Sequence, residues 1–266
     1  MRRSLRLIAS AIALLSLLAL LPIPGSSYGI GLDVSPAKLE VTIPPGAFKS
    51  IPITVHNSSL DPVHIQVSLA DFSLNLLGQY NFQRPGSRPD SLMRWATVRP
   101  REFDLPANTT QQVQFTLSIP DSKALKGEYA GVVFFQTRPL RGAGQRIAFS
   151  ARVASKIYAS IPGTVKIDGA IVKMAALRSP IGEQYHVLFR NLGNAHVYLR
   201  GNLQIERNGV TVDRVPLPNQ ALCERGQDRL LEVRGKQLPA GSYQAIATID
   251  YGGSTDTGGA IGFKVP

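Results

Sequence analysis

The segment Val113–Ile119, VQFTLSI, carries a large apolar residue at every second position. Such a period of two is typical of a β-strand with one buried face, because successive side chains point to opposite sides of a sheet. The same alternation occurs upstream, in Ile51–Val55 and in Val63–Leu69. These segments therefore predict strands of a sheet that covers a core with one face.

Further strands follow downstream of this segment. Tyr129–Phe135 is apolar on both faces and predicts a central strand, and the long run Arg146–Ile161 alternates again. Clusters of Pro, Gly, Asn and Ser separate the runs, as turns do. The sequence predicts no helix of any length, apart from a single helical turn at 121–125.

A second set of alternating segments begins after Ile161-Pro162-Gly163, starting with Val165 and Ile167. Asn208-Gly209 between two of these segments is typical of a type I′ hairpin, because both central residues of that turn need a positive φ. Each half has the size of one immunoglobulin-like sandwich. We therefore predict an all-β protein with two immunoglobulin-like β-sandwich domains in tandem, at residues 30–162 and 163–266.

The first 29 residues differ from the rest of the chain. Arg2, Arg3 and Arg6 precede the apolar run Leu7–Leu21, and small residues follow up to Gly29. This order is typical of a secretory signal peptide, and we expect it to be cleaved after Gly29. The alternative is an uncleaved membrane anchor; both readings place the remaining chain outside the cytoplasm. No later run is long enough to span a membrane, so we expect a soluble exported product that meets the membrane only through its signal peptide.

The composition excludes several classes of function. One cysteine rules out an intramolecular disulfide framework, and four histidines leave little material for a metal site. No carboxylate pair stands out among the 18 acids, so we expect neither an enzyme nor a bound cofactor or metal. The formal net charge is +11, and without the three arginines of the signal peptide it becomes 26 − 18 = +8. Export makes nucleic acid an unsuitable partner despite this charge.

Much of the positive charge falls in the segment 78–101. It includes Arg84, Arg88 and Arg94, and Asp90 is its one acid. Such a cluster favours either a binding face for an anionic glycan, headgroup or protein, or a solvated connection whose arginines only maintain solubility. The sequence leaves both readings open.

The segment Trp95–Ala107, WATVRPREFDLPA, adds a family resemblance. A Gln-x-Val-x-Phe strand follows it, then Ile119-Pro120-Asp121, and then Gly127-Glu128-Tyr129 opens an apolar strand. Together these features resemble the first domain of the PapD-type periplasmic pilus chaperones. The resemblance covers roughly residues 30–162, and it implies two immunoglobulin-like domains set in a boomerang shape.

The resemblance also implies a binding site. In this family, a basic residue near the start of the first strand and a lysine near the end of the domain's last strand bind the C-terminal carboxylate of a pilus subunit. Lys38 and Lys156 match these positions. Alternating apolar residues before the second lysine form the strand that is lent to the subunit, and Ile147, Phe149 and Ala151 fall at the matching offsets.

The sequence thus favours a periplasmic chaperone that donates a β-strand to incomplete pilus or surface-fibre subunits. The resemblance implies those subunits and an outer-membrane usher as partners. The alternative is a secreted or cell-surface module, such as a cell-wall binding protein, that uses the arginine-rich segment to bind glycan or another anionic partner.

Overall fold

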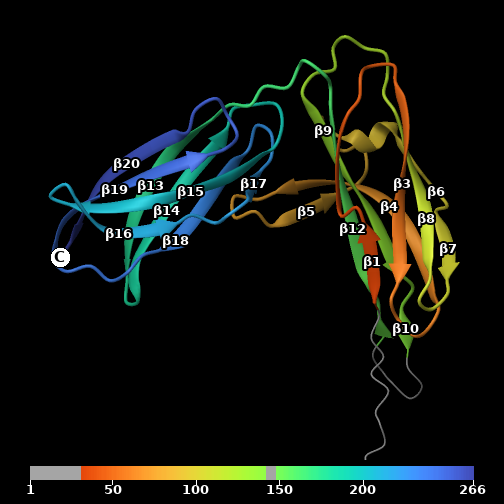
Figure 1. Ribbon diagram of the computed structural model, residues 1–266, viewed down its shortest axis with the longest axis horizontal. Coiled ribbons are helices and arrows are strands. Elements are labelled where there is room, and N and C mark those ends of the chain that lie inside the picture. The colour runs from red at the N-terminus through yellow and green to blue at the C-terminus, as the bar shows by residue number, and fades with distance from the viewer. Residues whose placement is uncertain (1–30, 142–147) are drawn as a thin grey trace, which may run out of the picture.

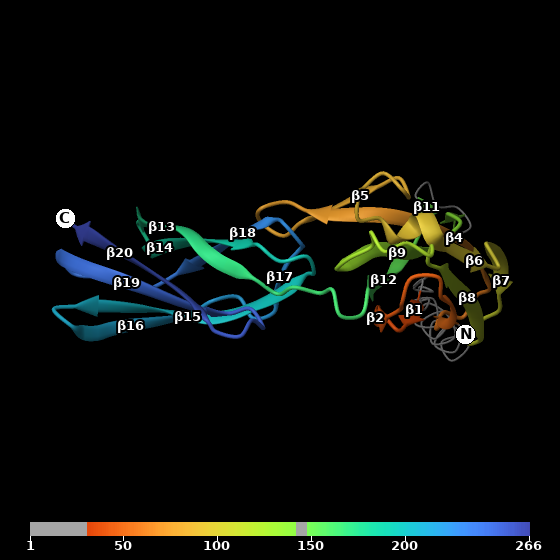
Figure 2. The same cartoon turned by 90° about the horizontal axis from the view of Figure 1, so that it is seen from above.

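The computed structural model of the protein describes residues 31–141 and 148–266 (Figure 1). Its elements are β-strands, with one short 3-10 helix, η1, at Leu92–Trp95. The strands form two β-sandwiches that follow one another along the longest axis of the molecule (Figure 2). The predicted all-β fold with two tandem sandwiches is therefore confirmed. The predicted signal peptide lies outside the described residues.

The first sandwich consists of strands β1 to β12. One of its sheets has the strand order β1-β3-β8-β6: β1 (Leu32–Ser35), β3 (Phe48–Asn57), β8 (Thr110–Ser118) and β6 (Ala96–Arg99). The facing sheet has the order β2-β12-β9-β4-β5: β2 (Lys38–Thr42), β12 (Arg152–Ser160), β9 (Glu128–Thr137), β4 (Val63–Leu74) and β5 (Tyr80–Gln83). β7 (Glu102–Leu105) also pairs with β4, and β10 (Leu140–Arg141) pairs with β11 (Ala148–Phe149).

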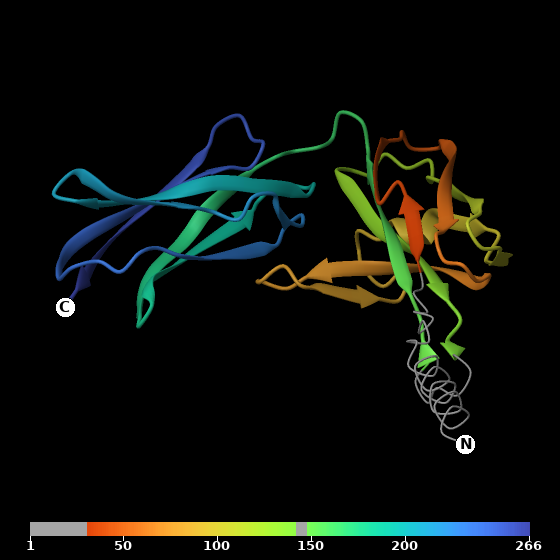
Figure 3. The same ribbon diagram turned by 60° about the horizontal axis from the view of Figure 1, so that its bottom comes forward.

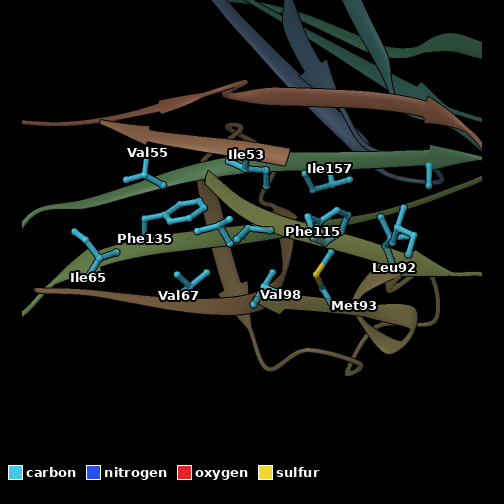
Figure 4. Close-up of a cluster of buried hydrophobic side chains, with 14 of the residues drawn as sticks. Ile53, Val55, Ile65, Val67, Leu92, Met93, Val98, Phe115, Phe135 and Ile157 are labelled. Carbon is cyan, nitrogen blue, oxygen red and sulfur yellow. The ribbon is translucent and has the colours of Figure 1, made fainter. Parts of the chain in front are cut away.

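The core between these two sheets is built from the alternating residues of the strands. Phe115 of β8 in one sheet, and Phe135 of β9 and Ile157 of β12 in the other, are fully buried in this core (Figure 4). Leu92 and Met93 of η1 fill the same core. Burying an aliphatic or aromatic side chain contributes about 1.5–3 kcal/mol, so these positions provide much of the stability of the domain.

A second apolar cluster covers the outer face of the sheet that contains β9. Phe72 of β4, Val132 and Phe134 of β9, and Tyr158 of β12 are buried there. β9 thus buries side chains on both of its faces, as predicted for Tyr129–Phe135. This outer face is the one turned toward the second sandwich.

The second sandwich consists of strands β13 to β20. One sheet contains β13 (Gly169–Ser179), β14 (Gly182–Asn191) and β18 (Asp228–Arg234). The other contains β16 (Val210–Pro216), β15 (Val197–Arg207), β19 (Gly241–Asp250) and β20 (Thr257–Val265), and β17 (Ala221–Cys223) pairs with β15. Asn208 and Gly209 between β15 and β16 have φ of 50° and 78°, as the predicted type I′ turn requires.

The structure corrects two local predictions. Val165 and Ile167 do not begin a strand, because the chain between Ser160 and Gly169 is the connection between the sandwiches. Residues 121–125 form a single turn, in which the Leu125 amide donates to the Ser122 carbonyl oxygen at 3.3 Å, but the short helix of the described residues lies instead at η1. In η1 the Ser91 hydroxyl caps the turn by accepting a hydrogen bond from the Met93 amide at 3.2 Å.

Within the described residues, no helix is long and apolar enough to cross a membrane.

Candidate partner-binding site

Strand β12 has one fully paired edge and one edge that is only partly paired. Along its whole length, Arg152–Ser160, it forms an antiparallel ladder with β9. On its other side β2 pairs with it in parallel, but only from Lys156 to Ser160. In the described part of the chain, the first half of β12 therefore has no strand partner on this side.

The hydrogen-bond pattern tells which backbone groups lie at this open edge. The Lys156 amide donates to the Ala37 carbonyl oxygen at 3.0 Å, and the Ser160 carbonyl oxygen accepts from the Ile43 amide at 3.0 Å. Even-numbered residues of β12 thus direct their backbone groups toward the β2 side. By the same alternation, the N–H and C=O groups of Arg152 and Ala154 point to the open edge. An edge of this kind is able to accept a strand from another protein.

The two lysines stand where the open edge ends. Lys38 is the first residue of β2, and its partner in the parallel ladder is Lys156. Paired residues of neighbouring strands lie about 4.8 Å apart and project to the same face of the sheet. Both lysines therefore project to the outer face, which is turned toward the second sandwich. The structure brings these two predicted site residues together.

Each lysine reaches a tyrosine hydroxyl. The Lys156 Nζ donates to the Tyr80 hydroxyl at 2.9 Å, and the Lys38 Nζ donates to the Tyr198 hydroxyl at 3.3 Å. Tyr80 belongs to β5, whereas Tyr198 belongs to β15 in the second sandwich. The Lys38 Nζ also forms a salt bridge of 2.8 Å with Glu40 Oε1. The hydrogen bond to Glu40 raises the pKa of Lys38 and lowers the pKa of Glu40.

Aromatic rings line the surface between the two lysines and the second sandwich. Tyr158 stacks on the His196 ring with centroids 4.0 Å apart, and His196 meets the Tyr198 ring edge-on at 5.1 Å. On the other side, Tyr158 meets Phe72 edge-on, and Phe72 packs against Tyr80. We call Phe72, Tyr80, Tyr158, His196 and Tyr198 the aromatic floor of the site.

Hydrogen bonds hold the two sandwiches together beside this floor. His196 donates its backbone amide and its Nδ1 proton to the buried Glu128 carboxylate, at 3.1 Å and 2.7 Å. The Tyr158 hydroxyl donates to Glu224 Oε1 at 3.3 Å. Glu224 is buried, and this loss of hydration raises its pKa to about 7. The position of Tyr198 relative to Lys38 is thus fixed by several contacts.

A hairpin of the first sandwich provides a further contact between the domains. The turn between β4 and β5 extends toward the second sandwich (Figure 3). There the Leu76 carbonyl oxygen accepts hydrogen bonds from the Leu230 amide at 2.8 Å and from the Arg229 guanidinium at 3.1 Å. This hairpin carries Tyr80, so the contact also positions that side chain.

The three predicted apolar residues of the donated strand have different positions. Ile147 lies outside the described residues. Phe149 is in β11 and its side chain is 51% exposed. Ala151 is half-buried and packs against the core of its own domain. The structure therefore presents Phe149 to solvent and does not place Ala151 beside it on an exposed face.

The arginine-rich segment contains β5, η1 and β6, and two arginines in and beside the loop between β5 and η1 bond within the segment. Arg88 forms a two-point salt bridge with Asp90 at 3.0 Å, and Arg94 donates to the Gly86 carbonyl oxygen at 2.9 Å. The buried Asp71 carboxylate accepts from the Ser91 hydroxyl at 2.5 Å. It also accepts from the Arg88 amide at 3.0 Å. Arg84 is exposed. Two of the three arginines proposed as an anionic-partner loop thus have a role in holding the loop itself.

Across residues 31–141 and 148–266, no group of three or more His, Cys, Asp or Glu side chains is placed to hold a metal ion.

Sequence reasoning did not identify Tyr80, Tyr198 and Glu40 as neighbours of the lysines. Glu40 lies two residues from Lys38 in β2, and this spacing alone places both on one face. Tyr80 and Tyr198 come from distant parts of the chain, and no local pattern of the sequence relates them to either lysine.

Comparison with known proteins gave matches among solved structures alone. No family model matches the chain, and no curated protein matches it. The class 5 fimbriae chaperone CfaA has 14% sequence identity and a TM-score of 0.49, with coverage of 89% of this chain and 100% of CfaA. A chain of the Salmonella enterica complex of SafA pilin with the SafB chaperone has 12% identity and a TM-score of 0.48, with coverage of 89% and 99%. The YadV chaperone has 15% identity and a TM-score of 0.44, with coverage of 87% and 99%. These three structures are described as chaperones or as a complex with a chaperone.

Proposed function

We propose that the protein is a non-enzymatic, exported chaperone for incomplete pilus or surface-fibre subunits. It lends the open edge of β12 to the client subunit, and it binds the C-terminal carboxylate of that subunit between Lys38 and Lys156. The observation that carries the proposal is that the open edge ends at the position where the two lysines stand side by side.

The proposal implies a direction for the client strand. Its carboxylate lies at Lys156, and the preceding residues extend back along Arg152 and Ala154 toward β11. The client strand therefore runs parallel to β12, and it ends where β2 begins. Main-chain hydrogen bonds contribute affinity in such an added strand, and charge-assisted hydrogen bonds to the carboxylate set its register.

Phe149 is the side chain best placed to enter the client. It is half-exposed although it is a large aromatic residue, and it lies three residues before β12, the strand whose edge is lent. Ile147 is proposed to act with it on the basis of the sequence resemblance. Ala151 has no assigned contact with the client, because its side chain packs inward and both its amide and its carbonyl oxygen are bonded to Thr137.

The proposal is tested by affinity purification of the tagged mature protein from its native envelope. The wild type is compared with Lys156→Ala and with Lys49→Ala, in which an exposed lysine of β3 on the other sheet is removed. We expect a small β-rich secreted protein to be recovered with the wild type and with Lys49→Ala, and to be lost with Lys156→Ala.

Recovery of wall fragments or an anionic glycan, at equal levels from all three proteins, would overturn the proposal in favour of a surface-binding module. The internal bonds of Arg88 and Arg94 argue against that second reading, because those cations already have partners.

A further inference from the structure

Each lysine of the site forms a hydrogen bond with a tyrosine hydroxyl, and the proton of that hydroxyl has no acceptor among the described residues. In both pairs the ammonium group donates and the phenolic oxygen accepts. A tyrosine hydroxyl is also a donor, and its own proton remains available when its oxygen accepts. Among the described residues, neither the Tyr80 hydroxyl nor the Tyr198 hydroxyl donates to a protein acceptor. Each therefore offers a hydrogen bond beside a positive charge.

These two hydroxyl donors are suited to bind an anion. A hydroxyl that accepts from a cation becomes a stronger donor, because hydrogen bonds in a chain polarise one another. A carboxylate is an acceptor only, and its two oxygens offer about four lone-pair positions. Two ammonium groups and two hydroxyls make four donor groups, one for each of these positions.

The site already holds a carboxylate of the protein itself. Glu40 Oε1 lies 2.8 Å from the Lys38 Nζ, on the same face of β2. Side chains of both residues are about half exposed, at 42% for Lys38 and 50% for Glu40. The cation next to Tyr198 is therefore open to a carboxylate that approaches from solvent.

From these observations we infer that Tyr80 and Tyr198 are binding residues of the carboxylate site: their hydroxyls donate hydrogen bonds to the terminal carboxylate that Lys156 and Lys38 attract. This inference rests on the proposed function and adds two residues to it. With these residues the site depends on both sandwiches, because Tyr198 belongs to β15 and Tyr80 to the hairpin that contacts Leu230. A free α-carboxylate is thus preferred to a blocked chain end.

If Tyr80 and Tyr198 only pack their rings against the lysines, removal of the hydroxyl should not affect binding of the carboxylate. The Lys156 Nζ lies 5.2 Å from the centroid of the Tyr80 ring, and the Lys38 Nζ lies 4.7 Å from that of Tyr198. Substitution by phenylalanine keeps the ring and its attraction for the ammonium group but removes the hydroxyl. Tyr80→Phe and Tyr198→Phe therefore separate the proposed role from packing.

The test uses a dansyl-labelled peptide of alternating valine and serine residues, prepared with a free C-terminal carboxylate and as the C-terminal amide. Binding is measured for the wild type, Tyr80→Phe, Tyr198→Phe and Lys156→Ala. The control is Tyr243→Phe, because Tyr243 also lies near a cation, Arg207, but within the second sandwich alone. Thermal unfolding verifies that each variant is folded.

We expect each of Tyr80→Phe and Tyr198→Phe to weaken binding of the free acid about tenfold, as for one hydrogen bond to a charged group. Binding of the amide is expected to stay unchanged, and so is binding of both peptides by Tyr243→Phe. If Lys156→Ala loses the preference for the free acid while both phenylalanine variants keep it, the inference is overturned and the proposed function stands. If the wild type binds acid and amide equally, or binds neither, the proposed function itself fails.

Discussion

Lys38 and Lys156 are direct partners in a parallel β-ladder, although one lies in the second strand of the first sandwich and the other in its last strand. The ladder begins at this pair, so within the described chain the preceding half of β12 is paired with β9 on one edge and has no strand partner on the other. Two like charges placed side by side repel one another, and an anion bound between them relieves that repulsion. The pair therefore marks both the end of an open edge and a place for a negative group.

Glu40 is expected to compete with the client carboxylate for Lys38. Because its side chain already holds the Lys38 ammonium at 2.8 Å, Glu40→Gln removes a negative charge that the client must displace. We predict that this substitution strengthens binding of the free-acid peptide about threefold to tenfold, since charges near a surface interact with about 1 kcal/mol. Fluorescence titration at two salt concentrations measures the effect, which is larger at low salt.

The control for this prediction is Glu206→Gln, which makes the same chemical change in β15 within the second sandwich. Weaker or unchanged binding by Glu40→Gln would show that Glu40 supports the site instead of competing for it.

His196 is expected to keep the two sandwiches in their relative orientation. Its ring stacks on Tyr158 and its Nδ1 donates to Glu128 at 2.7 Å, so His196→Ala removes both contacts. We predict a loss of about 2 kcal/mol of interdomain stabilisation, and a wider range of domain orientations in small-angle X-ray scattering. His186→Ala is the matched control, because His186 pairs with Glu232 inside the second sandwich. Identical scattering from both variants would contradict this role of His196.

Glu224 is expected to make folding stability depend on pH. Burial raises its pKa from 4.5 to about 7, so between these values the folded protein holds a proton that the unfolded chain releases. The free energy of unfolding therefore falls as the pH rises from about 4.5 to about 7, and this contribution is constant above that range. Glu224→Gln removes the slope and, by linkage, makes the protein more stable at pH 8 by on the order of 3 kcal/mol.

Urea unfolding of the wild type and of Glu224→Gln at pH 5 and pH 8 measures this effect. The difference between the two proteins isolates Glu224 from the other titrating groups. Equal slopes in both proteins would contradict the assignment of a raised pKa to this carboxyl group.

The strands that the sequence predicted well have either a strict alternation or a continuous apolar run. Val113–Ser118 lies within β8, where the period of two coincides with the burial of alternate side chains. Tyr129–Phe135 lies within β9, where the continuous apolar run coincides with burial on both faces. Val165 and Ile167 show the same spacing but lie in the connection between the sandwiches. Two apolar residues at a spacing of two are too few to distinguish a strand from an extended linker.

Local patterns of the sequence could not identify the residues that contact the two lysines. The two lysines were located through a family resemblance, and their contact depends on a parallel pairing of strands that are distant in sequence. Tyr198 approaches Lys38 because contacts between the sandwiches, such as that of His196 with Glu128, hold the second sandwich in place. For the arginine-rich segment, the sequence indicated the positive charge but not the hydrogen bonds and salt bridge that Arg88 and Arg94 form within the segment.

The most direct test of strand donation is hydrogen exchange of the β12 amides, measured by NMR with and without the free-acid peptide. We predict that the amides of Arg152 and Ala154, which point to the open edge, exchange at least about tenfold more slowly when the peptide is bound. Those of Val153 and Ser155, which face β9, should change little. Unchanged exchange at Arg152 and Ala154, while the peptide is bound in a Lys156-dependent manner, would contradict the claim that β12 lends its edge to a client.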